Sequence, residues 1–165
     1  MNGNRLSTLR GSGTRGSVEW VFDRLDRFPD ALLSLLMRLA VAGVFFRSGQ
    51  LKFAGFPLRL SLSALTQFRN QFKVPLLAPE VAATLTMVFE LTCPVLIVIG
   101  LATRLATLPL LAMTAVIEVF VFPNAWPTHI QWAALLIFIL VRGPGPISLD
   151  AVIWPWLSYR RGARP

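Results

Sequence analysis

The sequence predicts an all-α integral membrane protein: a four-helix bundle with an amphipathic segment between the first and second helices. The first observation is composition, because 55% of the 165 residues are hydrophobic and only 15% are charged. A soluble domain usually carries about 25% charged residues. The second is the mean hydropathy of +0.62, which is too high for a single soluble core. The third is the arrangement of the apolar residues in four separate runs.

These runs cover residues 31–49, 81–100, 105–122 and 130–141. A membrane-spanning helix needs about 20 mostly apolar residues, so the first three qualify. The fourth is short, and it spans a bilayer only if the flanking residues lie at the interfaces. Within the long connection 50–80, apolar residues recur among polar and basic residues over 59–72. We expect an amphipathic helix there, lying on the membrane surface or folded over the mouth of the bundle.

Three regions follow from this reading. Residues 1–29 comprise a Gly-, Ser- and Arg-rich disordered tail, at 1–17, and an interfacial segment, where the pattern over 18–30 predicts a short helix. Residues 30–157 form the transmembrane domain, and residues 158–165 form a basic C-terminal tail. The net charge of +8 comes largely from arginines in the tails, which suits contact with the lipid bilayer rather than with nucleic acid. The excess of arginine on the same side as both termini predicts that the termini are cytoplasmic.

Four ionisable residues lie inside the apolar runs: Arg38, Arg47, Glu90 and Glu118. Such residues are costly in a bilayer and mark either a functional interior or a paired structural site. Depths estimated from the helical rise allow two pairs, Arg38 with Glu90 and Arg47 with Glu118. Helix phase places Arg38 and Lys52 on one interior stripe. Arg47 lies on the opposite side, where it either snorkels outward or pairs with Glu118. The pairs either fix helix register or belong to a substrate, proton or quinone site.

Other chemistry-bearing residues are few. Cys93 is the single cysteine and is expected to be a small buried hydrophobe, so neither an internal disulfide nor a cysteine-only metal site is available. His129 is the single histidine and is expected at the membrane interface. We expect no metal site, and no haem, flavin or iron–sulfur motif is present.

The stretch "GPGPISLD", residues 143–150, predicts the end of the fourth helix at the cytoplasmic face. Gly143 and Gly145 permit tight backbone geometry, and Pro144 prevents the helix from continuing. Ser148 or Asp150 is expected to cap a following interfacial segment, residues 151–157. Arg104 and Arg142 are further candidate partners of Asp150. We therefore interpret the stretch as a structural motif of the cytoplasmic face, with docking of a soluble partner as the alternative.

Several of these segments together resemble the DoxX family of small bacterial membrane proteins. The first helix and its sequel, "RLAVAGVFFRSGQLKFAGFP", resemble the family through Arg38, Gly43, Phe46, Gly49 and Lys52. The second and third helices do so through Glu90, Gly100, Thr103, Arg104 and Met113. The C-terminal signature does so through Gly143, Pro144, Gly145, Ser148 and Asp150. The resemblance covers residues 31–152.

The resemblance implies a four-helix protein of the bacterial inner membrane. Some relatives are associated with thiosulfate:quinone oxidoreduction, and others are membrane partners of superoxide and thiol detoxification enzymes. One hypothesis is therefore a redox subunit that holds a quinone headgroup among Arg38, Lys52 and Glu90 and exchanges electrons with a soluble oxidoreductase. The other is a non-enzymatic scaffold or small-anion transporter whose buried charges are structural. A copurified quinone favours the first, and a closed, fully charge-paired core favours the second. The substrate and the oligomeric state stay open.

Overall fold

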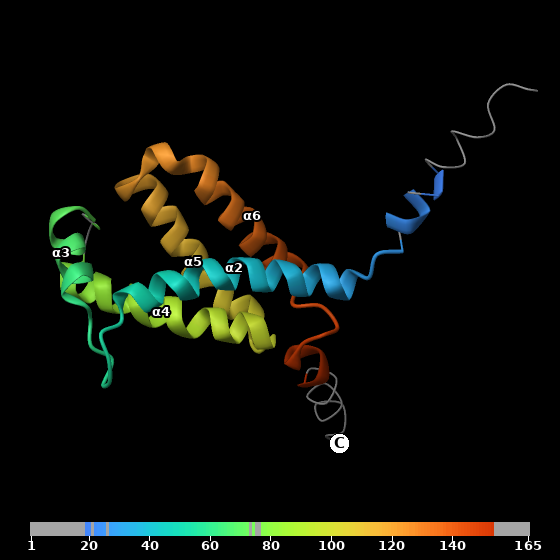
Figure 1. Ribbon diagram of the computed structural model, residues 1–165, viewed down its shortest axis with the longest axis horizontal. Helices are drawn as coiled ribbons and strands as arrows, with labels where there is room; N and C mark the ends of the chain where they lie inside the picture. Colours follow the sequence, from blue (N-terminus) through green and yellow to red (C-terminus); the bar gives the residue numbers. More distant parts are fainter. Residues whose placement is uncertain (1–18, 21, 26, 73, 75–76, 154–165) are drawn as a thin grey trace, which may run out of the picture. The chain divides into compact units, whose positions relative to one another are not determined.

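The computed structural model describes residues 19–20, 22–25, 27–72, 74 and 77–153, which form two units divided after Asp30. The larger unit contains all but the first residue of α2 (Asp30–Lys52), together with the long helices α4 (Pro79–Ile99), α5 (Thr103–Val116) and α6 (Trp126–Arg142) (Figure 1). A π-helix, η1 (Ile117–Val121), extends α5, and a 3₁₀ turn, η2 (Pro123–Ala125), leads into α6. The helix α3 (Leu62–Asn70) lies between α2 and α4 in the chain.

Four segments are long and apolar enough to cross a membrane: Asp30–Lys52, Pro79–Ile99, Thr103–Val121 and Pro123–Arg142. The prediction of an all-α, multi-pass membrane bundle is confirmed. The fourth span is longer than its apolar run suggested, because helical structure begins at Pro123 and not at Ile130. Pro123 and Pro127 both fall in first turns, where a missing backbone N–H costs little.

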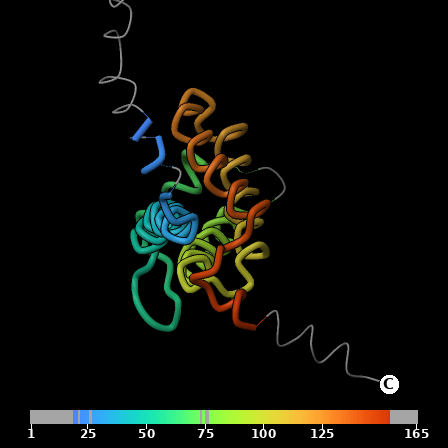
Figure 2. The backbone as a smooth tube through the Cα atoms, turned by 90° about the vertical axis from the view of Figure 1, so that its right-hand side faces the viewer, coloured from blue at the N-terminus to red at the C-terminus, as the bar shows by residue number. Residues whose placement is uncertain are grey.

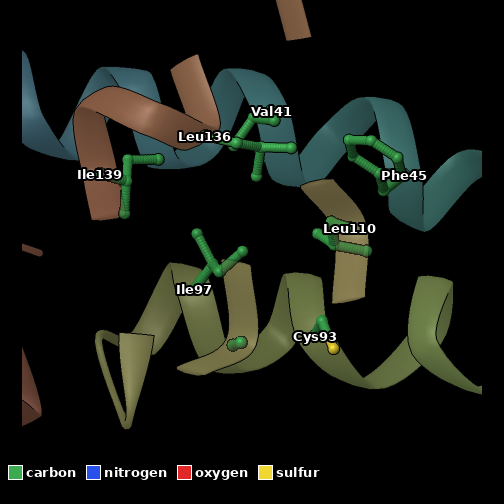
Figure 3. Close-up of a cluster of buried hydrophobic side chains, with 8 residues drawn as sticks. Val41, Phe45, Cys93, Ile97, Leu110, Leu136 and Ile139 are labelled. Carbon is green, nitrogen blue, oxygen red and sulfur yellow. The ribbon is translucent and has the colours of Figure 1, made fainter. Parts of the chain in front are cut away.

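The first span confirms the predicted helix phase. Its buried side chains recur every three or four residues and form one stripe: Ser34, Arg38, Val41, Ala42, Phe45, Gly49 and Lys52. Arg47 lies on the exposed side. Val41 and Phe45 join a core with Cys93, Ile97, Leu110, Leu136 and Ile139, so Cys93 is the small buried hydrophobe that was expected (Figure 3).

The connection between α2 and α4 contains the predicted amphipathic helix, although it is shorter than residues 59–72. Ser61 caps it, because its hydroxyl oxygen accepts a hydrogen bond from the Ala64 backbone N–H at 3.2 Å. Phe68 packs against Ala82 and Ala83 of α4, so this helix folds onto the bundle. The loop that precedes α3, residues 53–61, projects away from the helices in both backbone views (Figures 1 and 2).

The elements of the larger unit gather at two ends, the turn end and the cavity end. The turn end consists of the start of α2, the end of α4, the start of α5, the end of α6 and residues 143–153. The cavity end consists of the end of α2, α3, the start of α4, η1, η2 and the start of α6. In the smaller unit, residues 19–20 and 22–25 are helical. The predicted disordered tail (1–17), the basic tail (158–165) and residues 154–157 of the interfacial segment lie outside the described residues.

Candidate functional site

Arg38 lies at the turn end and is completely buried. Its Nη1 donates to the carbonyl oxygens of Ile97 (3.3 Å) and Val98 (2.9 Å), and its Nη2 donates to the carbonyl of Ile147. The last carbonyls of a helix have no partner within the helix and carry partial negative charge. Arg38 therefore caps the C-terminus of α4 and ties it to the segment after α6.

The glycines of the turn end let these segments approach closely. Gly100 has φ +73°, and a Cβ on it would lie 2.3 Å from the Cβ of Ser148 and 3.0 Å from Nη1 of Arg38. Gly145 has φ +78°, and a Cβ there would lie 2.9 Å from the hydroxyl of Ser34. These two positions need glycine for both their backbone conformation and their space.

Asp150 caps α5 from outside that helix. Its Oδ1 accepts from the Ala102 N–H (2.8 Å), and its Oδ2 accepts from the Thr103 N–H (3.0 Å) and hydroxyl (2.9 Å). Ala102 provides no capping side chain of its own, so the carboxylate satisfies otherwise unpaired donors at the positive end of the helix. The suggested partners Arg104 and Arg142 are wrong, because the carboxylate is occupied by this helix start and Arg104 instead donates to the Val141 carbonyl (3.2 Å).

Ser148 behaves as the sequence suggested. Its hydroxyl oxygen accepts from the Ala151 N–H at 3.2 Å, which caps the helical residues that begin at Leu149. The same hydroxyl donates to the carbonyl of Gly145 at 2.7 Å, and the Ser34 hydroxyl donates to the carbonyl of Pro144 at 2.9 Å. The "GPGPISLD" stretch is thus a network of backbone and side-chain hydrogen bonds that joins α2, α4, α5 and α6.

Lys52 and Glu90 meet at the cavity end. The Lys52 Nζ lies 2.6 Å from Oε2 of Glu90 and also donates to the Ser48 hydroxyl at 2.8 Å. Both side chains are almost entirely buried. A Cβ on Gly49 would lie 3.0 Å from the Cβ of Glu90, so the absence of a side chain at Gly49 lets α2 and α4 approach here.

The predicted pair between Arg38 and Glu90 is therefore not formed. Arg38 lies fourteen residues before Lys52, which is about 21 Å along α2. Similar depths in the sequence did not fix which basic residue of α2 reaches Glu90. The predicted buried stripe of α2 is confirmed, but the predicted partner of Glu90 is wrong. Lys52 binds Glu90, whereas Arg38 binds backbone carbonyls.

The Lys52–Glu90 pair lies on the wall of a cavity of about 700 Å³ that is formed by α2, α3, α4, α5, η1 and α6. This volume falls in the range of small-molecule sites, roughly 300–1,000 Å³. Most of the lining is apolar, and aromatic side chains contribute from several elements: Phe45, Phe68, Phe72, Phe89, Phe122 and Trp132. The cavity end thus combines an apolar interior with a buried charge pair, which is the usual composition of a ligand site.

A second polar pair, His129 with Glu118, stands beside this cavity. The Nδ1 of His129 lies 2.5 Å from Oε2 of Glu118. His129 lines the cavity, and its ring centroid is 5.2 Å from that of Trp132. The predicted Arg47–Glu118 pair is wrong, because Glu118 is engaged by His129 and exposed Arg47 makes no ion pair with any residue that the structure describes.

Sequence reasoning placed His129 at an interface and did not connect it to Glu118. A usable signal was present, because the two residues stand at nearly equal distances from the turn at 122–125. Two residues at equal distances from the turn of a helical hairpin lie at similar positions along the axes of its two helices. Glu118 also lies in the π-helix η1, and such short π-segments occur frequently at functional sites.

The model of the DoxX family matches residues 33–123, which is more than half of the chain. The chain belongs to the DoxX family. The matched range runs from the first turn of α2 through η1 and contains Arg38, Lys52, Glu90 and Glu118, but neither His129 nor the "GPGPISLD" stretch. No similarity to a curated protein or to a solved structure was found.

Proposed function

We propose that this DoxX family protein binds the ring of a quinone or quinol in the cavity and exchanges electrons with a soluble oxidoreductase. The observation that carries the proposal is the Lys52–Glu90 pair on the wall of an apolar cavity of about 700 Å³. A lipid-soluble redox carrier needs an apolar, partly aromatic slot and a donor or proton-transfer group beside each oxygen. Lys52 suits a carbonyl as a donor, and Glu90 suits a hydroxyl as an acceptor.

The structure changes which residues we place at the headgroup. Arg38 is excluded, because its terminal nitrogens are bound to backbone carbonyls at the turn end. Lys52 and Glu90 remain, and His129 joins them on the cavity wall. The cavity and its charge pair are the site to which we assign the ligand, and the turn end is assigned a structural role.

The alternative of a scaffold has one observation in its favour: Lys52 and Glu90 neutralise each other, as a purely structural pair does. The same neutrality weakens the case for a small-anion transporter, because no unpaired cation among the lining residues of the described chain remains to attract the anion. A scaffold, however, gains nothing from an open cavity beside the pair, since unfilled space costs packing energy.

We place the protein in the bacterial inner membrane with both termini in the cytoplasm. Arg104 and Arg142 lie at the turn end, and the sequence before α2 and after residue 153 contains further arginines. The cavity then opens in the outer half of the bilayer. Fusions of a reporter that is active only in the periplasm test this orientation, since activity at either terminus contradicts it and activity in the 53–61 loop is expected.

The binding proposal is tested with two tryptophan substitutions on one helical arm. Val116→Trp fills the cavity that Val116 lines, whereas Val119→Trp adds the same ring at an exposed position outside the lining. Bound quinone is quantified in purified wild type and both variants, and decylubiquinone is titrated into each. We expect wild type and Val119→Trp to bind alike and Val116→Trp to lose at least about tenfold in affinity, or about 1.4 kcal/mol. Absence of bound and titratable quinone from the wild type would leave the scaffold as the function.

A further inference from the structure

Only one of the two ring nitrogens of His129 is engaged by another described residue. Nδ1 is bound to Glu118 at 2.5 Å, and Nε2 has no hydrogen-bond partner among the described residues. Within the described chain, Nε of Arg38 is the one fully buried side-chain nitrogen or oxygen without a partner. Because Nε2 of His129 also has no partner, it must retain some accessible surface. Since His129 lines the cavity and its Nδ1 is occupied, Nε2 is the nitrogen available to a ligand there.

Glu118 binds the ring of His129 without lining the cavity. It is not among the lining residues, and its side chain is 31% exposed compared with 6% for His129. A carboxylate at Nδ1 keeps a proton on that nitrogen in both charge states of the ring. Only Nε2 then gains or loses a proton, and the Glu118 carboxylate stabilises the imidazolium when it does.

We propose that His129 exchanges a proton with the ligand in the cavity and that Glu118 is the positioning residue that fixes its tautomer. This inference rests on the proposed quinone function. When a quinol occupies the cavity, its hydroxyl O–H bond breaks and an Nε2–H bond forms. The products are a phenolate-type anion of the ring and an imidazolium paired with Glu118. The reverse transfer returns the proton, and neither direction requires an oxidant.

The two charge states of His129 prefer different redox forms of the ligand. A neutral Nε2 accepts a hydrogen bond, which favours the hydroxyl of the quinol. A protonated Nε2 donates, which favours the carbonyl of the quinone. The affinity ratio of quinol to quinone should therefore be higher when Nε2 carries no proton. The other titratable groups that face the cavity or His129 are Lys52 from α2, Glu90 from α4 and Glu118 from η1.

Aromatic rings lie between His129 and the Lys52–Glu90 pair. Trp132 lies between His129 and Phe45, with ring centroids 5.2 Å and 5.6 Å away. Phe45 is followed one turn later by Ser48, the hydrogen-bond partner of Lys52. The polar groups of the cavity thus form two poles separated by aromatic rings, as suits a ring that carries oxygens on opposite edges.

The test measures anaerobic affinities of decylubiquinol and decylubiquinone at about pH 5.5 and about pH 8.5. For the wild type we expect the quinol-to-quinone affinity ratio to rise by about tenfold between these values, the equivalent of one hydrogen bond. His129→Gln should bind both forms with a ratio that does not change. Glu118→Gln should reduce the change, and Glu118→Asp should restore most of it. Glu19→Gln, in the other unit of the chain, controls for the loss of one acidic group.

The outcomes separate this inference from the proposed function. If the wild type binds neither form, the quinone function itself is wrong. If it binds both and the ratio does not change with pH, the quinone function stands and the role of His129 is overturned. An equal change in His129→Gln and the wild type assigns the pH dependence to Lys52 and Glu90 and also overturns the proposal. Glu118→Gln keeps the test decisive if His129→Gln does not fold.

Discussion

The turn end and the cavity end both bury a basic residue of α2, and they use it in opposite ways. Arg38 at the turn end donates to three backbone carbonyls and is packed against Gly100, with no exposed surface. Lys52 at the cavity end binds one carboxylate and borders an open volume of about 700 Å³. A buried charge therefore indicates a ligand site only when its partners leave room beside it.

The difference has a physical basis in the groups that accept the hydrogen bonds of Arg38 and Lys52. Backbone carbonyls at the end of α4 cannot move or titrate, so Arg38 serves as a fixed connection. A side-chain carboxylate such as Glu90 can rotate, accept a proton and release its partner to another acceptor. The cavity end is consequently the end at which a ligand can compete for hydrogen bonds.

The largest effect is expected from Arg38→Met. The substitution leaves the carbonyls of Ile97, Val98 and Ile147 without their donor, and hydrogen bonds to charged groups contribute about 1.5–3 kcal/mol each. Because some of these groups find other partners, we expect a loss of about 4 kcal/mol in the free energy of unfolding in detergent micelles. Arg104→Met is the control, since exposed Arg104 makes one hydrogen bond to Val141 and should cost about 1 kcal/mol. Equal losses in the two variants would contradict the role given to Arg38.

The next largest effect is expected from Gly100→Ala. The new Cβ would lie 2.3 Å from the Cβ of Ser148 at a left-handed backbone position, so the turn must move. We expect a loss of about 2–3 kcal/mol, from strain and overpacking together. Gly43→Ala is the matched control, because a Cβ at Gly43 meets nothing within 4 Å. Thermal unfolding of the two variants side by side measures the difference, and a stable Gly100→Ala would show that the turn end adapts easily.

At the cavity end, Glu90→Gln should cost more stability than Glu118→Gln. Glu90 is 3% exposed and its loss leaves the Lys52 ammonium buried without a counter-charge, whereas Glu118 is 31% exposed. We expect about 2 kcal/mol for Glu90→Gln, because the amide still accepts one hydrogen bond, and less than about 1 kcal/mol for Glu118→Gln. Chemical denaturation of both proteins at one pH decides the ranking, and comparable stability would refute it.

The smallest effect on stability is expected from removing both charges, in Lys52→Met/Glu90→Leu. Replacing a buried pair with apolar residues of similar size is often neutral, so we expect a change within about 1 kcal/mol of the wild type. Binding of decylubiquinone should nevertheless fall by at least about tenfold. A stable double variant that still binds quinone would remove Lys52 and Glu90 from the site and end the contrast between the two ends.

Most of the fold was predictable from the sequence because hydropathy depends on local composition and helix phase depends on local spacing. The four spans, the buried stripe that holds Arg38 and Lys52, the exposed Arg47 and the cap at Ser148 all follow from spacing along one segment. The length of α6 was underestimated because Trp126, Pro127 and His129 interrupt the apolar run but not the helix.

The partners of the buried charges were not predictable in the same way. Depth along a helix does not tell which helices are adjacent, so Arg38 was paired with Glu90 and Arg47 with Glu118. Backbone carbonyls are present at every residue and leave no mark in a sequence, which hid the acceptors of Arg38. Asp150 was expected to meet an arginine because its true partners, the backbone N–H groups at the start of α5, are equally unmarked.

The contacts of the turn end also have a consequence for biosynthesis. Ile147, which accepts from Arg38, follows it by 109 residues, and Asp150 follows the helix start that it caps by 47 or 48 residues. While a ribosome is still making the later spans, α2 already carries Arg38 and α5 already carries its uncapped start. In the nascent chain, these groups must therefore be satisfied by water or lipid headgroups at the membrane surface. Their contacts in the finished bundle form only after residues 143–150 have been synthesised.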